Sequence, residues 1–141
     1  FEAGLRTAAS SGNQGKAAEA RWLGSLAVSG LNNRILRLHR PFLHRAFRNN
    51  AYQCSIAICA DSAYRIAESF STLTNPDLMM GQPAFIILHN LNAAIALATL
   101  LFCSLHLPDS DPTIIAHRQH LNTISQTLQQ GCRSTDPAYN K

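Results

Sequence analysis

The stretch AYQCSIAICADSAYRIAESFSTL, residues 51–73, decides the fold class. Its apolar side chains recur at alternating intervals of four and three residues, which places them on one continuous helix face. The members of this face are Tyr52, Ile56, Cys59, Ala63, Ile66 and Phe70. Asp61 and Arg65 stand four residues apart with the acid first, an order that favours a helix. The pattern predicts an amphipathic helix over residues 51–73.

A second helical pattern precedes this one, over residues 17–38. Its predicted core-facing stripe consists of Leu23, Ala27, Leu31, Ile35 and Leu38. Arg40 stands before Pro41, and the proline ring pushes the preceding backbone out of the helical region, so the helix should end there. Residues 1–16 are small and polar, with the run SSGNQG at 10–15, and predict a flexible lead-in.

A third helix is predicted over the apolar run 84–107, with Pro83 suited to its first turn. The run is long enough to cross a membrane. However, His89, Asn90 and Asn92 interrupt it, and polar side chains cost free energy in lipid. A helix that is apolar nearly all round is typical of the centre of a bundle. We therefore predict a buried core helix and no membrane span.

A fourth helix is predicted to begin at Pro112, with Asp111 as its N-cap, and to end at Gly131. Its predicted core-facing stripe consists of Ile114, His117, Leu121, Ile124 and Leu128. Residues 77–82 read as a loop and 132–141 as a tail. The fold class is therefore all-α, a bundle of about four main helices spanning residues 17–131 and forming part of a larger helical domain.

Two adjacent stretches carry a resemblance to a known family. The first helix ends in the sequence Leu38-His39-Arg40-Pro41-Phe42-Leu43, and the next helix contains Cys59-Ala60-Asp61-Ser62-Ala63. This pair resembles the regulatory middle homology region of fungal binuclear zinc-cluster transcription factors. The resemblance is best over residues 31–70 and looser over 84–128. We expect the motif Leu38, His39, Arg40, Pro41 and Phe42 to be structural, with Leu38, Phe42 and Leu43 in the core and His39 and Arg40 capping carbonyl groups.

The resemblance implies a nuclear regulator of transcription in which this chain is a fragment without chemistry of its own. Zinc and specific DNA binding would belong to a cluster upstream of Phe1, so no cofactor is expected here. The expected partners are other parts of the same transcription factor or another protein, and a homo-oligomer is a further expectation. Some regulators of this family respond to small effectors through this region, which suggests a hydrophobic effector.

The positive charge is concentrated near the start of the chain. Residues 1–48 contain eight basic and two acidic residues, within a formal net charge of +4. Arg34, Arg37, Arg45 and Arg48 form the core of this basic patch. The patch lacks interleaved aromatic residues and a recognition-helix signature. We therefore expect a solvated face or an intramolecular acidic contact, and no specific recognition of nucleic acid by this fragment.

Polar residues follow one side of the third predicted helix, at His89, Asn92, Thr99, Cys103 and His106. They are expected either to face solvent or to bond to neighbouring helices. The sharper hypothesis is that they line an apolar ligand cavity, because small-molecule sites combine apolar walls with a few polar groups.

Other candidate sites have simpler explanations. His117 and His120 are three residues apart, but no third ligand of suitable spacing is nearby, so they are predicted to be surface histidines and not a metal site. The cysteines form no C-x-x-C pair, and serines form no G-x-S-x-G elbow. We therefore predict a protein that is not an enzyme. The alternatives are a small helical carrier of a hydrophobic ligand and an enzyme with dispersed site residues.

Overall fold

The computed structural model describes residues 2–71 and 83–135, with side chains described for residues 15–71 and 84–130. The long helices are α1 (Glu2–His39), α3 (Cys54–Ser71), α5 (Pro83–Cys103) and α6 (Pro112–Thr135). The short helix α2 (Leu43–Ala46) lies between two 3-10 turns, η1 (Arg40–Phe42) and η2 (Asn50–Tyr52). These described residues contain no strand, and the all-α prediction is confirmed. The loop predicted at 77–82 lies outside the described residues.

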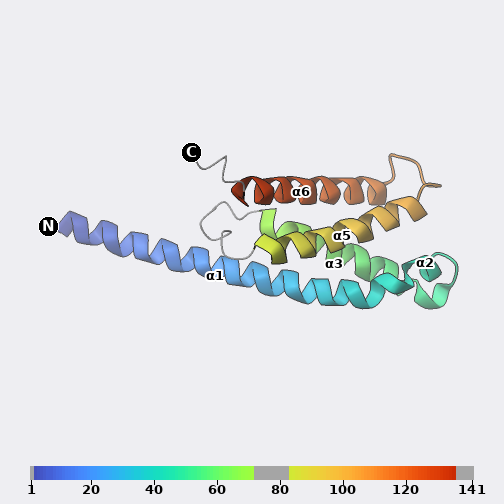
Figure 1. Cartoon of the computed structure of the whole chain (residues 1–141), viewed down its shortest axis with the longest axis horizontal. Helices are drawn as coiled ribbons and strands as arrows, with labels where there is room; N and C mark the ends of the chain where they lie inside the picture. Colours follow the sequence, from blue (N-terminus) through green and yellow to red (C-terminus); the bar gives the residue numbers. More distant parts are fainter. Residues whose placement is uncertain (1, 72–82, 136–141) are drawn as a thin grey trace.

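The long helices form an antiparallel bundle in which each runs opposite to the one before it (Figure 1). Helices α3 and α5 occupy the middle of the bundle. Helices α1 and α6 lie on opposite sides, and each packs against both α3 and α5. The N-terminal part of α1 extends beyond the other helices (Figure 1). One side of α5 therefore has no helix packed over it in the described part of the chain.

The core lies where α3 meets the other three long helices. Its main cluster contains Leu36, Leu43, Cys59, Ala63, Ile66, Ala67, Ala93, Ala96, Leu97, Leu100 and Ile124. Four residues of the face predicted over 51–73 are buried on α3, namely Cys59, Ala63, Ile66 and Phe70. Ile56 is half-buried, and Tyr52 lies on η2 because α3 begins only at Cys54. A second cluster at the other end joins Trp22, Phe70 and Ile86, with the Trp22 and Phe70 ring centroids 6.0 Å apart.

The predicted core-facing stripe of α1 is wrong. Leu23, Leu31 and Leu38 are 58%, 61% and 70% exposed. The buried face instead carries Trp22, Ser29, Asn32, Asn33 and Leu36. The sequence prediction placed the core-facing side of α1 from the spacing of its apolar side chains alone. The structure buries polar side chains on α1 because several of them find hydrogen-bond partners, which removes most of the cost of burying them.

The predicted helix ends are partly right. Helix α1 stops at His39, before Pro41, as the proline requires. Asp111 accepts a hydrogen bond from the Thr113 amide at 2.8 Å, which confirms it as the N-cap of α6. Helix α6 continues through Gly131 to Thr135, so the predicted terminator is wrong. Helix α1 begins at Glu2, although the sequence predicted a flexible lead-in over 1–16. Small polar residues weaken a helix but do not stop one that lacks proline.

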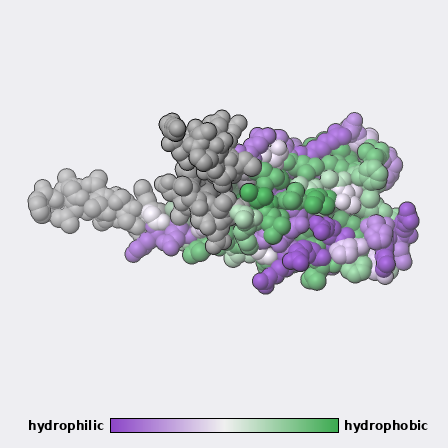
Figure 2. Space-filling model, in the orientation of Figure 1, coloured by the Kyte–Doolittle hydropathy of each residue, from purple (hydrophilic) through white to green (hydrophobic). Residues whose placement is uncertain are grey.

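Helix α5 is less enclosed than its composition predicts. Leu88, Leu91, Ile95 and Phe102 are 54%, 49%, 45% and 74% exposed. They follow a spacing of three, four and seven residues, so they share one side of the helix, which we call the open α5 face. Figure 2 shows hydrophobic surface over the middle of the bundle, where α5 lies in Figure 1.

The composition of α5 also resembles that of a membrane helix. The segment Ala84–Cys103 is long and apolar enough to cross a membrane, and 39% of an 18-residue window within it is buried inside the bundle. Core helices of soluble proteins have the same length and composition. Its packing against α1, α3 and α6 is the arrangement of a core helix with one uncovered side.

We predict that Ile66→Ala lowers the free energy of unfolding by ~2–5 kcal/mol, because Ile66 is fully buried and its removal leaves a cavity. The matched control is Ile115→Ala on α6, where the side chain is 42% exposed and the expected change is within about 0.5 kcal/mol. Urea unfolding followed by circular dichroism measures both. Equal losses for the two variants would contradict the described core.

Candidate functional site

The motif at the end of α1 forms a corner that joins three helices. His39 Nδ1 lies 3.1 Å from the Ser55 hydroxyl at the start of α3. The Phe42 ring stacks on Tyr52, with centroids 5.5 Å apart and planes 6° from parallel. Leu43 is almost fully buried in the main core cluster. The chain direction therefore reverses here through packing as well as through Pro41.

Arg40 extends the corner to α5. Its guanidinium donates to the Asn92 side-chain oxygen at 3.2 Å. The Asn92 amide donates in turn to the Asn33 side-chain oxygen at 3.0 Å. The expected carbonyl caps are wrong, since His39 and Arg40 bond to side chains of other helices. The expected burial of Leu38 and Phe42 is also wrong. Leu38 points away from the bundle side of α1, and the Phe42 ring, stacked on Tyr52, remains 37% exposed.

A second polar contact joins α1 and α5 near the other end of the bundle. His89 Nδ1 lies 2.9 Å from the Ser29 hydroxyl, and both side chains are buried. The Phe85 ring packs on His89, with centroids 3.7 Å apart. Burial lowers the pKa of His89 below its usual value. A neutral imidazole is therefore the form that this site favours.

The five polar residues predicted as a ligand lining do not share one environment. His89 and Asn92 bond to α1, which is the interhelical alternative that the sequence left open. Thr99 is half-buried and donates to the Ile95 carbonyl of its own helix at 2.8 Å. Cys103 is half-buried at the end of α5, and His106 is exposed beyond it. The ligand-lining hypothesis stays a prediction.

The basic patch surrounds the corner. Arg34 and Arg37 lie on α1, Arg45 on α2 and Arg48 just after it, and all four are exposed. On α1, Arg34 lies one turn after Gly30, which faces Phe85 of α5. Arg37 lies one turn after Asn33, which bonds to Asn92 of α5. The two α1 arginines therefore border the side of the bundle where the open α5 face lies.

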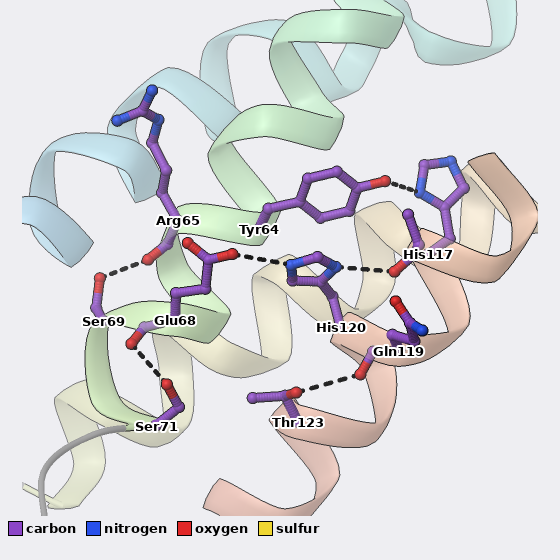
Figure 3. A network of polar contacts seen from close by, with 10 residues as sticks. Tyr64, Arg65, Glu68, Ser69, Ser71, His117, Gln119, His120 and Thr123 are labelled. Atoms are coloured by element: carbon purple, nitrogen blue, oxygen red, sulfur yellow. Dashed lines mark hydrogen bonds and ion pairs between the residues drawn. The ribbon is translucent and has the colours of Figure 1, made fainter. Parts of the chain in front are cut away.

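A cluster that the sequence did not predict lies between α3 and α6 (Figure 3). It contains Tyr64 and Glu68 from α3 and His117 and His120 from α6, and we call it the α3–α6 cluster. The Tyr64 hydroxyl lies 2.6 Å from His117 Nδ1. His117 is 2% exposed, so its prediction as a surface histidine is wrong. It lies on the buried stripe of α6 because Tyr64 satisfies its ring nitrogen.

The second histidine of the cluster lies over the Tyr64 ring, with centroids 3.9 Å apart and planes 20° from parallel. His120 Nε2 is 3.1 Å from a carboxylate oxygen of Glu68, and Nδ1 is 2.8 Å from the Ala116 carbonyl oxygen. His120 is half-buried, and Glu68 is exposed. This residue therefore links the two helices at the protein surface.

The cluster supplies interhelical bonds more readily than catalysis. Burial lowers the pKa of His117, and the neighbouring His120 lowers it further. Burial also raises the pKa of Tyr64. A protonated phenol donating to a neutral imidazole fits both directions. In this arrangement His117 carries its own proton on Nε2, and both nitrogens of His120 are engaged, so neither ring has an unengaged basic nitrogen.

The sequence contained a signal for this cluster. His117 occupies a position on the apolar stripe of α6, and a histidine at such a position needs a buried partner. Tyr64 and Glu68 stand four apart on α3, as do Asp61 and Arg65, so each pair shares one side of that helix. Only the packing of α3 against α6 brings Tyr64 and Glu68 next to His117 and His120.

No group of three His, Cys, Asp or Glu side chains in the described residues is positioned to hold a metal ion. Comparisons with protein-family models, with curated proteins and with solved structures find no match to this chain. The function of this chain is therefore inferred from its residues and their geometry.

We predict that Tyr64→Phe lowers the free energy of unfolding by about 1–3 kcal/mol, because the buried His117 nitrogen loses its donor. The control is Tyr52→Phe, since the half-buried Tyr52 ring contributes stacking on Phe42 that a phenylalanine retains. Chemical denaturation of both variants checks this. A Tyr64→Phe loss no larger than that of the control would rule out the bond.

We also predict that stability falls as the pH drops from 6.5 to 5. Burial holds the pKa values of His89 and His117 below the value of about 6.5 for an unfolded histidine. The unfolded chain therefore binds protons that the folded chain does not, and acid favours unfolding. Urea unfolding across this range should show a smaller pH slope for a His89→Gln, His117→Gln double variant. The slope should be unchanged in His44→Gln, an exposed control.

Proposed function

We propose that this chain is part of the regulatory helical region of a fungal binuclear zinc-cluster transcription factor. It controls the state of the activator through contacts with other parts of the same protein and carries out no chemistry of its own. In this proposal it acts in the nucleus, and zinc and specific DNA contacts belong to another part of the transcription factor.

The observation that carries the proposal is the role of the motif residues. The two stretches of resemblance, the corner at 38–43 and the helix that follows it, pack against one another. His39 bonds to α3, and Arg40 bonds to α5. Residues of the motif thus determine how the helices of the bundle are joined, which is what a structural signature of a helical regulatory region requires.

The open α5 face supports a protein contact as the means of control. Helix α5 contains no Asp, Glu, Lys or Arg, and four of its large apolar side chains are exposed on one side. Exposed apolar surface rimmed by polar residues is typical of protein interaction sites. The exposed Arg34 and Arg37 border this side. We infer that the occupant is a segment of the same transcription factor with an apolar stripe bordered by carboxylates.

The test is a transcription reporter in yeast. The 141-residue chain is placed between an unrelated DNA-binding domain and an acidic activation domain. We predict lower reporter output than from the same fusion without the chain, since the acidic activation domain can occupy the open α5 face. Leu91→Glu should restore output, because a charge on this face repels carboxylates and disfavours apolar contact. Ile115→Glu, an exposed apolar position on α6, is the matched control and should leave output low.

Two further variants test the corner. Arg40→Ala should also restore output, since the bond to Asn92 is lost, whereas Arg48→Ala, at an exposed arginine, should not. Circular dichroism of the purified chains shows which variants keep the helices. Unchanged reporter output on adding the chain, or equal effects of Leu91→Glu and Ile115→Glu, would contradict the proposed function.

A further inference from the structure

Helix α1 carries an apolar stripe on the side that faces away from the bundle. The stripe consists of Leu23, Ala27, Leu31 and Leu38, and we call it the α1 leucine stripe. Its members follow intervals of four, four and seven residues, so they share one side of the helix. Each leucine is more than half exposed, and Ala27 is exposed as well. In the described part of the chain, no other helix packs over this side of α1 (Figure 1).

Basic side chains border the α1 leucine stripe. Lys16 and Arg34 lie in line with its leucines, and Arg21 lies at its far edge, as the turn of the helix dictates. All three side chains are exposed. No acidic residue occurs between Glu19 and Asp61, a segment that contains six arginines. This side of the molecule therefore combines a row of leucines with a concentrated positive charge.

The positive charge of α1 has no acidic partner within the bundle. Arginines elsewhere do have one, since Arg65 pairs with Asp61 at 2.9 Å and Arg118 pairs with Asp109 at 2.6 Å. In the described residues, no ion pair includes a basic side chain of α1. The charge complement of this side is therefore an anionic partner outside the bundle.

The leucines narrow the kind of anionic partner. Nucleic acid binds positive charge through its phosphates but has no apolar layer that would take up a row of leucines. A folded acidic protein would need a groove shaped to a long helix on the outside of a bundle. A bilayer with anionic lipids fits both features, because apolar side chains enter the boundary of the acyl chains while basic side chains remain among the headgroups.

We propose that the outer side of α1 binds a membrane surface rich in anionic lipid. Helix α1 lies in the plane of the interface, with the leucines of its stripe inserted at the level where headgroups meet acyl chains. Lys16, Arg21 and Arg34 contact the headgroups. The other helices stay on the water side, so this contact is not a membrane span. The inference goes beyond the proposed function, which depends on the corner and the open α5 face.

The test is co-sedimentation of the chain with vesicles of phosphatidylcholine, or of an equal mixture of phosphatidylcholine and phosphatidylserine. The chain should bind the mixed vesicles at low salt, bind the neutral ones much less, and dissociate at high salt. An Arg21→Gln, Arg34→Gln double variant should bind the mixed vesicles roughly tenfold more weakly. The control Arg65→Gln, Arg118→Gln removes the same charge from arginines that are already paired, and should bind like the wild type.

Two results of this experiment would overturn the proposal. One is an equal loss of binding in the two double variants, which would mean that net charge alone attracts the chain. The other is equal binding to neutral and mixed vesicles. Circular dichroism of each variant confirms that the helices are retained.

A second set of variants separates insertion of leucines from attraction to any polyanion. Leu31→Gln should weaken binding to the mixed vesicles roughly tenfold, because the inserted side chain is lost. Ile115→Gln, an exposed apolar position on α6, is the matched control and should leave binding unchanged. Leu91→Gln, on the open α5 face, should also leave it unchanged. Binding that tolerates Leu31→Gln, or that Leu91→Gln weakens equally, would contradict the proposal.

Fluorescence quenching locates the inserted side directly. Trp22 is the one tryptophan of the chain, and it is 8% exposed, so lipid should quench it little. On mixed vesicles with brominated acyl chains, the added emission of Leu31→Trp should be quenched and that of Ile115→Trp should not. Equal quenching of the two variants would reject α1 as the side that enters the membrane surface.

Discussion

Polar side chains buried between α1 and α5 are the constraint on which the arrangement of the bundle depends. Ser29 bonds to His89, and Asn33 bonds to Asn92, which also accepts from Arg40. Leaving such a group buried without a partner costs about 1–3 kcal/mol, so a rotation of α1 that breaks these bonds is penalised several times over. The rotation that satisfies them turns another side of α1, rich in leucine, toward solvent.

On the opposite side of the bundle, buried polar groups again have hydrogen-bond partners, but here the partners are a tyrosine and a carboxylate. Helix α6 meets α3 through the α3–α6 cluster, in which one histidine is buried and neutral and the other is partly exposed and bonded to two acceptors. Burial lowers the pKa of His117, whereas His120, one turn away, is only half-buried. The two outer helices thus add polar bonds, in part through buried neutral histidines, to the apolar packing that also joins α3 and α5.

The consequence for function is a bundle with one incompletely covered face. Since polar bonds determine which side of α1 is buried, leucines remain exposed on α1, and α5 exposes its own apolar side between α1 and α6. An uncharged helix face bordered by arginines is suited to contact with another polypeptide. In the proposed regulator the same constraint therefore explains both the internal arrangement and the availability of a contact surface.

Local sequence patterns were enough to predict the helical class, most of the buried face of α3, the end of α1 before Pro41, and the N-cap and apolar stripe of α6. These features depend on local periodicity, proline sterics and side-chain-to-backbone bonds, which act over a few residues. The packing of the helices was needed to establish which side of α1 is buried, which groups His39 and Arg40 bond to, and that His117 and His120 meet Tyr64 and Glu68. Those outcomes depend on partners about fifty residues away in the chain, or sixteen in the case of His39. A polar side chain is stable in the interior only where such a partner is present, and no local pattern records where the partner will lie.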